Sequence, residues 1–275
     1  MMKLRTLIFT SVMLPWILSS AAKDEYMEAR KPKKDEVIFP DYGIPQDSDS
    51  DPAAAPKAEE LPTCLLCVCL SGSVYCEEVS PEMSAVPALP KETAYLYARF
   101  NKITKISNND FADMVTLKRI DLTGNLIGVI EDGAFSRLPN LEELTLAENR
   151  LTKLPPLPTN LVSLNANFNK LSTQGVKGNA FKRAVLLQKL TRLEYLYLGN
   201  NDLTAVPQLP ESLCTVHLHN NKIAKITDET FCKGNTSYYI RTNMDEVRLD
   251  GNPVMLSKYP NSFICLQFLP IGWYN

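Results

Sequence analysis

Leu117-Lys118-Arg119-Ile120-Asp121-Leu122-Thr123-Gly124-Asn125 is one copy of the nine-residue motif that decides the fold of this chain. The motif reads leucine, two variable residues, an apolar residue, one variable residue, a second apolar residue, two variable residues and asparagine. Between Thr93 and Val254 it occurs seven times, and its copies end on Asn101, Asn125, Asn149, Asn169, Asn201, Asn221 and Asn252. Successive asparagines are separated by 24, 24, 20, 32, 20 and 31 residues. Such a recurrence predicts a solenoid of stacked repeats.

The motif is that of leucine-rich repeats. We therefore predict an α/β-type repeat solenoid, a horseshoe with a curved parallel sheet on the concave face and irregular, 3-10 or polyproline segments on the convex face. The motif asparagines are expected to satisfy backbone groups of their own turn and of the neighbouring repeat, so we interpret them as structural.

The convex side should contribute large apolar residues to the core. Phe111, Phe135 and Phe231 are the candidates, one in each of three repeats. The proline-rich links at 154–158 and 206–210 cannot continue a helix, so those repeats should be extended on the back. A solenoid of this kind offers a long concave binding surface and usually has no catalytic cleft.

The first 22 residues are predicted to be a secretory signal peptide. Positive charge in residues 1–5 precedes an apolar run at 7–18, and small residues follow at 19–22. The alternative, a membrane anchor, is disfavoured because the apolar run is shorter than the ~20 residues that span a bilayer. No later stretch is long or apolar enough to span one, and residues 270–275 carry no lipid-anchor tail. We expect a secreted protein of the extracellular space and matrix, with no membrane partner.

Residues 23–60 form an acidic tail that is predicted to be disordered. Lys23 to Leu61 contain 11 acids and 6 bases, a net charge of −5, with few large apolar residues. Tyr26 and Tyr42 lie beside acidic residues, which makes them candidate sulfotyrosines; the alternative is that both are ordinary tail residues. Sulfation would strengthen the attraction of this tail for basic proteins.

Four of the seven cysteines form a cluster with the spacing C-x2-C-x-C-x6-C, at Cys64, Cys67, Cys69 and Cys76. Four thiolates could hold zinc, but an oxidising compartment favours disulfides, and three pairings are open. A bond between Cys232 and Cys265 would close a loop of about 33 residues and stabilise it by ~3–4 kcal/mol. The remaining Cys214 is expected to be an unpaired, partly shielded thiol; the alternative is an intermolecular disulfide in a homodimer.

These features define the expected organisation of the chain. It comprises a signal peptide at 1–22, an acidic tail at 23–60, an N-terminal cysteine cap at 61–92, seven leucine-rich repeats at 93–254 and a C-terminal disulfide-bracketed cap at 232–275 that overlaps the last repeat. Disulfides thus cap both ends of the repeat array, where an uncovered strand edge would invite aggregation.

Alternation along each strand decides which side chains face a partner. The candidate binding face consists of outward residues: Tyr95, Tyr97, Arg99, Arg119, Glu143, Tyr195, Tyr197, His217 and Arg248. Asp121, Thr145, Ser163, Asn165, Thr215 and Glu246 occupy the other outward positions. Exposed tyrosines with arginines and acids are typical of protein-binding surfaces, whereas the alternative is a solvated face with incidental aromatics.

Other functional chemistry is weakly represented. The net charge of −2 gives no global basic field for nucleic acid. His217 and His219 share a strand face, but no third metal ligand recurs near them in the sequence. No G-x-S-x-G nucleophile motif or phosphate-binding glycine loop is present, so we expect no enzymatic activity, cofactor or metal. Asn235-Thr236-Ser237 is a glycosylation acceptor, and Ser71-Gly72 is a weak glycosaminoglycan candidate.

Residues 62–76, 93–101, 249–253 and 269–272 resemble class III small leucine-rich repeat proteoglycans, and the resemblance extends from residue 61 to the end. It implies a connective-tissue matrix protein that associates with collagen fibrils and influences their assembly. As an alternative, it implies modulation of TGF-beta family factors in bone formation, and it allows keratan sulfate attachment.

The resemblance also implies specific covalent features. It pairs Cys64 with Cys69, Cys67 with Cys76, and Cys232 with Cys265, and it maps tail sulfation onto Tyr26 and Tyr42. Two features depart from the family pattern. Cys214 has no counterpart in the usual set of six cysteines, and residues 182–190 make the fourth-to-fifth spacing about six residues longer than expected.

Overall fold

The computed structural model describes residues 63–177, 187–233 and 238–275, which belong to one compact unit. The predicted signal peptide, the acidic tail with Tyr26 and Tyr42, the acceptor Asn235 and most of the 182–190 stretch lie outside the described residues.

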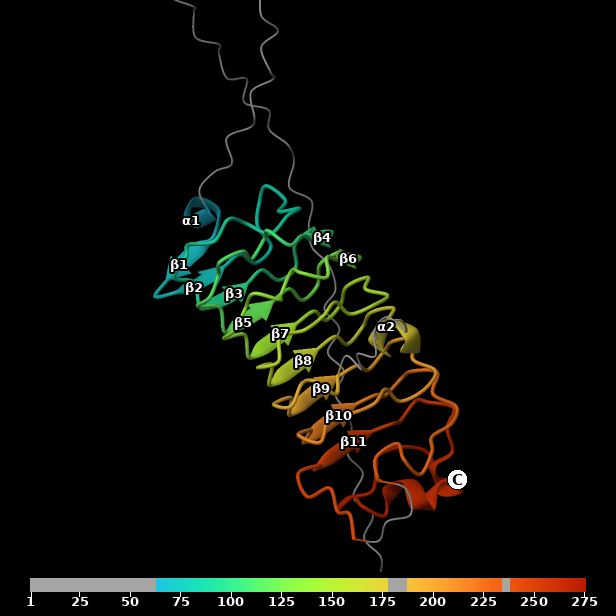
Figure 1. Ribbon diagram of the computed structural model, residues 1–275. Coiled ribbons are helices and arrows are strands. Elements are labelled where there is room, and N and C mark those ends of the chain that lie inside the picture. The colour runs from blue at the N-terminus through green and yellow to red at the C-terminus, as the bar shows by residue number, and fades with distance from the viewer. Residues whose placement is uncertain (1–62, 178–186, 234–237) are drawn as a thin grey trace, which may run out of the picture. The chain divides into compact units, whose positions relative to one another are not determined.

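A nine-stranded sheet forms one side of this unit, as Figure 1 shows. Its strands, in spatial order, are β1 (Val68–Leu70), β2 (Ser73–Tyr75), β3 (Tyr95–Tyr97), β5 (Arg119–Asp121), β7 (Glu143–Thr145), β8 (Ser163–Asn165), β9 (Tyr195–Tyr197), β10 (Thr215–His217) and β11 (Glu246–Arg248). From β2 onward every pair is parallel, and only β1 and β2 are antiparallel. This is the predicted leucine-rich repeat horseshoe.

The middle residue of each repeat strand points into the core, because side chains alternate along a strand. Leu96 pairs with Ile120, Ile120 with Leu144, and the register continues without a slip to Val247. These middle residues are at most 4% exposed, while the residue on either side of each is half-buried or exposed. A one-residue slip would turn the apolar set outward, so the apolar pattern specifies the register.

The seven motif asparagines bind each repeat to the one before it. Asn149 Oδ1 accepts a hydrogen bond from the Ile127 amide at 2.9 Å, and its Nδ2 donates to the carbonyls of Leu122 and Leu146 at 2.9 and 3.2 Å. The other six asparagines repeat this arrangement, and each is between 4% and 9% exposed. The structural role predicted for them is confirmed, because each side chain pairs backbone groups that would otherwise be buried without a partner.

The residue before each motif asparagine has a left-handed backbone. The seven φ angles are +55° at Phe100, +71° at Gly124, +54° at Glu148, +54° at Phe168, +55° at Asn200, +51° at Asn220 and +70° at Gly251. This conformation turns the chain sharply out of the strand and aims the asparagine side chain inward. Only two copies use glycine, although a side chain at such a φ costs conformational energy.

The back of the solenoid is filled by the predicted phenylalanines. Phe111 and Phe135 are 1% and 0% exposed and stack with ring centroids 5.8 Å apart, and Phe231 is 2% exposed. The links at 154–158 and 206–210 contain no helix or strand. Two features were not predicted: a small parallel sheet of β4 (Lys105–Ile106) and β6 (Val129–Ile130), and the five-residue helix α2 (Thr173–Lys177).

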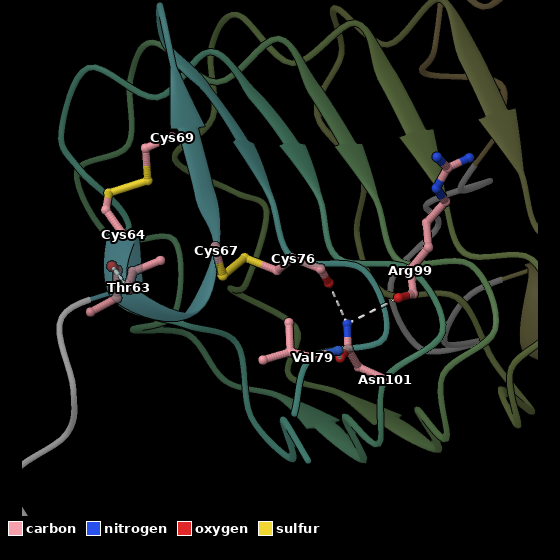
Figure 2. Close-up of a disulfide and its surroundings, with 9 residues drawn as sticks. Thr63, Cys64, Cys67, Cys69, Cys76, Val79, Arg99 and Asn101 are labelled. Atoms are coloured by element: carbon pink, nitrogen blue, oxygen red, sulfur yellow. Dashed lines mark hydrogen bonds between the residues drawn. A yellow bond between two sulfur atoms is a disulfide. The ribbon is translucent and has the colours of Figure 1, made fainter. Parts of the chain in front are cut away.

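Disulfides close the N-terminal end, as Figure 2 shows. Cys64 is joined to Cys69 and Cys67 to Cys76, the pairings that the family resemblance implies, and no zinc cluster forms there. The bonds hold helix α1 (Thr63–Leu66) and the β1–β2 hairpin against the first repeat, and β2 covers the edge of β3. Asn101 continues the asparagine ladder into this cap by donating to the Cys76 carbonyl at 2.5 Å.

The C-terminal end is closed by the Cys232–Cys265 disulfide and by the short 3-10 helices η1 (Leu256–Lys258) and η2 (Pro260–Phe263). Ile271 covers the edge of β11, because its N–H donates to Val247 at 2.8 Å and its carbonyl accepts from Leu249 at 2.7 Å. The first and last strands of the repeat array, β3 and β11, are therefore both covered by other segments of the chain.

Replacing one ladder asparagine should destabilise the whole repeat array. Asn149→Ala leaves the buried Ile127 amide without a partner and removes one of the two asparagine donors from each of the Leu122 and Leu146 carbonyls. We therefore expect the free energy of unfolding to fall by roughly 3 kcal/mol. Urea denaturation measures this loss. The control Asn261→Ala, at an exposed position, should change stability by less than about 0.5 kcal/mol. Equal losses in the two variants would contradict the structural role of the ladder.

Candidate binding face

The concave side of the sheet presents two columns of side chains. In register along the first column are Tyr95, Arg119, Glu143, Ser163, Tyr195, Thr215 and Glu246, and along the second are Tyr97, Asp121, Thr145, Asn165, Tyr197, His217 and Arg248. Parallel strands lie ~4.8 Å apart, so equivalent residues of successive repeats are neighbours. Every residue of the predicted binding face lies in these columns or, for Arg99, two residues beyond its strand. Their role in binding stays a prediction.

Charged side chains at the N-terminal end of this face are already paired with one another. The Arg99 guanidinium donates to Glu77 at 2.9 and 2.5 Å and lies 4.0 Å from Asp121. The hydrogen bond to Glu77 raises the pKa of Arg99 above its usual range, although burial opposes the shift. We call these residues, with the ion pair of Arg119 and Glu143, the N-terminal charged cluster.

The middle of the face is uncharged and aromatic. Tyr195 is 39% exposed, and Tyr197 lies beside it and half-buried on the same strand. Burial raises the pKa of the Tyr197 hydroxyl, and Tyr195 and Glu246 raise it further, so the Tyr197 hydroxyl is a neutral hydrogen-bonding group at physiological pH. The preceding strand contributes only Ser163 and Asn165. The middle of the concave face is therefore a polar, uncharged surface with two aromatic rings.

Histidines and a second set of charges follow at the C-terminal end. His217 packs its ring edge-on against Tyr197 with centroids 4.9 Å apart, and its Nε2 lies 3.2 Å from a Glu246 carboxylate oxygen without hydrogen-bond geometry. Arg248 pairs with Asp250 at 2.8 Å. We call His217, Glu246, Arg248 and Asp250 the C-terminal charged cluster. With one arginine and two carboxylates, it has a net charge of −1 when His217 is neutral.

His219 sits beside this cluster as a neutral base. Burial lowers its pKa, and the positive charge of Arg248 lowers it further, which outweighs the opposing effect of Asp250. The neutral ring can accept a hydrogen bond from the Asn200 amide, which lies 3.2 Å from Nε2. The ring also occupies the space above Gly199, where an added Cβ would lie 2.4 Å from it.

Tyr75 extends the aromatic character of the face and was missed from the sequence. It lies on β2 beside Tyr97, with ring centroids 4.9 Å apart and ring planes 5° from parallel. Tyr75 is 41% exposed. The alternation Ser73-Val74-Tyr75, with Val74 buried, signals a strand, but it lies inside the cysteine cluster and outside the repeat motif.

The remaining predicted sites are placed as follows. Cys214 is an unpaired, half-buried thiol, and burial raises its pKa, with Glu194 and Asp245 adding to the shift. Within residues 63–177, 187–233 and 238–275, no group of three or more His, Cys, Asp and Glu side chains is arranged to hold a metal ion. Over the same residues no helix has the length and apolar character needed to cross a bilayer.

The chain is similar to known leucine-rich repeat proteins. The leucine rich repeat family model, a repeat family and not a catalytic one, matches residues 115–171. Mimecan of Coturnix japonica is 61% identical over 231 residues, which cover 83% of this chain and 76% of that protein. Human mimecan is 54% identical, with 94% and 86% covered, and human epiphycan is 45% identical, with 84% and 70% covered.

A solved structure supports the fold. The crystal structure of human 5T4 (Wnt-activated inhibitory factor 1, Trophoblast glycoprotein) matches with a TM-score of 0.57. The match covers 75% of this chain and 80% of that one at 20% sequence identity, so it shows the fold alone.

The lowered pKa of His219 predicts a pH dependence of stability. Because the folded pKa lies below the unfolded value of 6.5, the unfolded chain binds more protons as the pH falls. The contribution of His219 to the free energy of unfolding is therefore complete above pH 6.5 and is lost as the pH drops through the folded pKa. Urea denaturation of the wild type and of His219→Asn between about pH 7.5 and 5 measures it. The variant should show the flatter dependence, and identical slopes would contradict the assignment.

Proposed function

Because the chain belongs to the small leucine-rich repeat proteoglycans of the extracellular matrix, the family of mimecan and epiphycan, we propose that it binds matrix proteins through its concave face. Collagen fibrils are the principal partner in this proposal, and their assembly is the process that the protein regulates. The protein reaches that partner as a secreted molecule.

The observation that carries the proposal is the uncharged aromatic centre of the concave face. Tyr195 and Tyr197 stand side by side there with Ser163 and Asn165, and none of the four is charged. Collagen chains are polyproline II helices rich in imino acids, and grooves lined with aromatic side chains are the usual receptors for such helices. Tyrosine combines a large apolar ring with a hydroxyl that can donate to an exposed backbone carbonyl.

A second aromatic site lies at a spacing that fits a rod-shaped ligand. Tyr97, stacked on Tyr75, is separated from Tyr197 by four strand steps, roughly 19 Å at ~4.8 Å per step. Six residues of a polyproline II chain rise about 19 Å, so two Gly-X-Y triplets cover the distance between the two sites. The residues between them, Asp121, Thr145 and Asn165, are small enough to admit a rod along the second column.

The proposal is tested by removing the central rings. Tyr195→Ala combined with Tyr197→Ala should weaken cosedimentation of the full chain with collagen fibrils by at least about tenfold, because buried tyrosines are typical hot spots of binding. The same variant should lose its effect on the turbidity curve of fibril formation.

Tyr238→Ala provides the matched control. This tyrosine is 94% exposed and lies outside the sheet, so its removal should leave cosedimentation unchanged. Circular dichroism and a urea midpoint show that the variants are folded. Wild-type affinity of the double variant, or an absence of any binding by the wild type, would overturn the proposal.

A second candidate is the modulation of TGF-beta family growth factors. The two charged clusters favour it, because a folded globular partner is recognised by complementary charge and not by aromatic contacts to an extended chain. Binding to an immobilised growth factor of that family should then depend on Arg119 and Arg248 and weaken with salt. A loss of growth-factor binding in Arg119→Ala and Arg248→Ala, with collagen binding intact, would separate the two candidates.

A further inference from the structure

We infer that the chain carries a second binding surface, for a sulfated polysaccharide, on the outer side of the turns that follow the strands. We call this surface the turn edge and define it by Phe100, Lys102, Glu148, Arg150, Phe168 and Lys170. These residues directly flank Asn101, Asn149 and Asn169 of the ladder. The inference does not depend on collagen binding, because none of the six residues lies on a strand of the concave face.

Backbone hydrogen bonds align the turn edge into two columns. The amides after the asparagines form one ladder: Arg150 donates to Ile127 at 2.9 Å and Lys170 donates to Leu151 at 2.9 Å. The amides before the asparagines form the other: Phe100 donates to Thr123 at 2.8 Å and Phe168 to Gly199 at 3.0 Å. Each asparagine points into the core, so the exposed residues directly before and after it lie on the outer side of the turn.

The cations of the turn edge differ from three other exposed lysines of the described chain, which have acidic partners. Lys105 lies 2.6 Å from Glu131, Lys222 lies 2.6 Å from Asp202, and Lys153 lies 3.8 Å from Asp132. In the described parts of the chain, by contrast, the side chains of Lys102, Arg150 and Lys170 have no ion pair or hydrogen bond. Glu148 is the one acid among the six residues, so the turn edge carries a net charge of +2.

Two phenylalanines accompany these cations in an unfavourable conformation. Phe100 and Phe168 are 48% and 54% exposed and have φ angles of +55° and +54°. Equivalent turns use Gly124, Asn200 and Gly251, residues that adopt a left-handed backbone more easily. Strained residues that expose a large apolar side chain are characteristic of binding sites.

A linear polyanion with apolar patches fits this arrangement. Three strand steps, roughly 14 Å, separate the Phe100 turn from the Phe168 turn, so the cations form a line and not a compact pocket. Arginine binds sulfate in a bidentate manner and lysine as a point charge. The C–H faces of sugar rings provide apolar surface for the two aromatic rings. Basic surface patches of this kind are typical of heparin-binding proteins.

The test uses heparin as the probe and the full chain as the protein. Lys102→Ala, Arg150→Ala and Lys170→Ala together should weaken binding on the order of 100-fold and lower the slope of log K against log salt by roughly two to three. The matched control replaces Lys105, Lys153 and Lys222 with alanine, which removes the same charge from cations that already have partners. Its effect should stay below about threefold.

The aromatic contribution is tested separately. Phe100→Ala with Phe168→Ala should weaken heparin binding while leaving the salt slope unchanged, since no charge is removed. Phe268→Ala, at another exposed phenylalanine, is the control and should bind as the wild type does. Equal losses in the two triple variants would show attraction by net charge alone and overturn the inference, as would an absence of heparin binding by the wild type.

Discussion

The asparagine ladder is the constraint on which the rest of this structure depends. Each short strand leaves its sheet through a turn buried against the neighbouring turn, and the backbone groups there have no water to bind. One asparagine side chain per repeat accepts a hydrogen bond from an amide of the preceding repeat and donates to carbonyls of that repeat and of its own. The repeats can therefore stack at a spacing that also allows neighbouring strands to pair and the leucines to pack.

The ladder determines both proposed binding surfaces. It holds the strands in register, which turns unrelated outward residues into continuous columns on the concave face. It also fixes an inward residue in each turn, so that the residues before and after it must face solvent. Charges on the concave face are mostly paired within the chain, whereas three cations of the turn edge are not. The two surfaces thus suit different chemistries: an uncharged aromatic rod and a polyanion.

Much of this architecture could be predicted because the motif has a fixed period. Leu96, Ile120 and Leu144 occupy core positions that alternation alone assigns, and Asn149 bonds as the motif requires. Features that depend on contacts between repeats could not be read in this way. The stack of Tyr75 on Tyr97 and the pairing of Arg99 with Glu77 join residues 22 positions apart through a cap strand that the motif does not cover. The left-handed backbone conformation of Phe100 and Phe168 could not be predicted either, because glycine or asparagine is the usual signal for such a turn.

The central claim, that the aromatic centre of the concave face receives collagen, is tested most directly by hydroxyl-radical footprinting. Side-chain oxidation is measured by mass spectrometry on the full chain, free and saturated with collagen fibrils. The account predicts that oxidation of Tyr195 and Tyr197 falls on binding while that of the exposed Tyr238 does not change. Unchanged oxidation of Tyr195 and Tyr197 in the bound protein would contradict it.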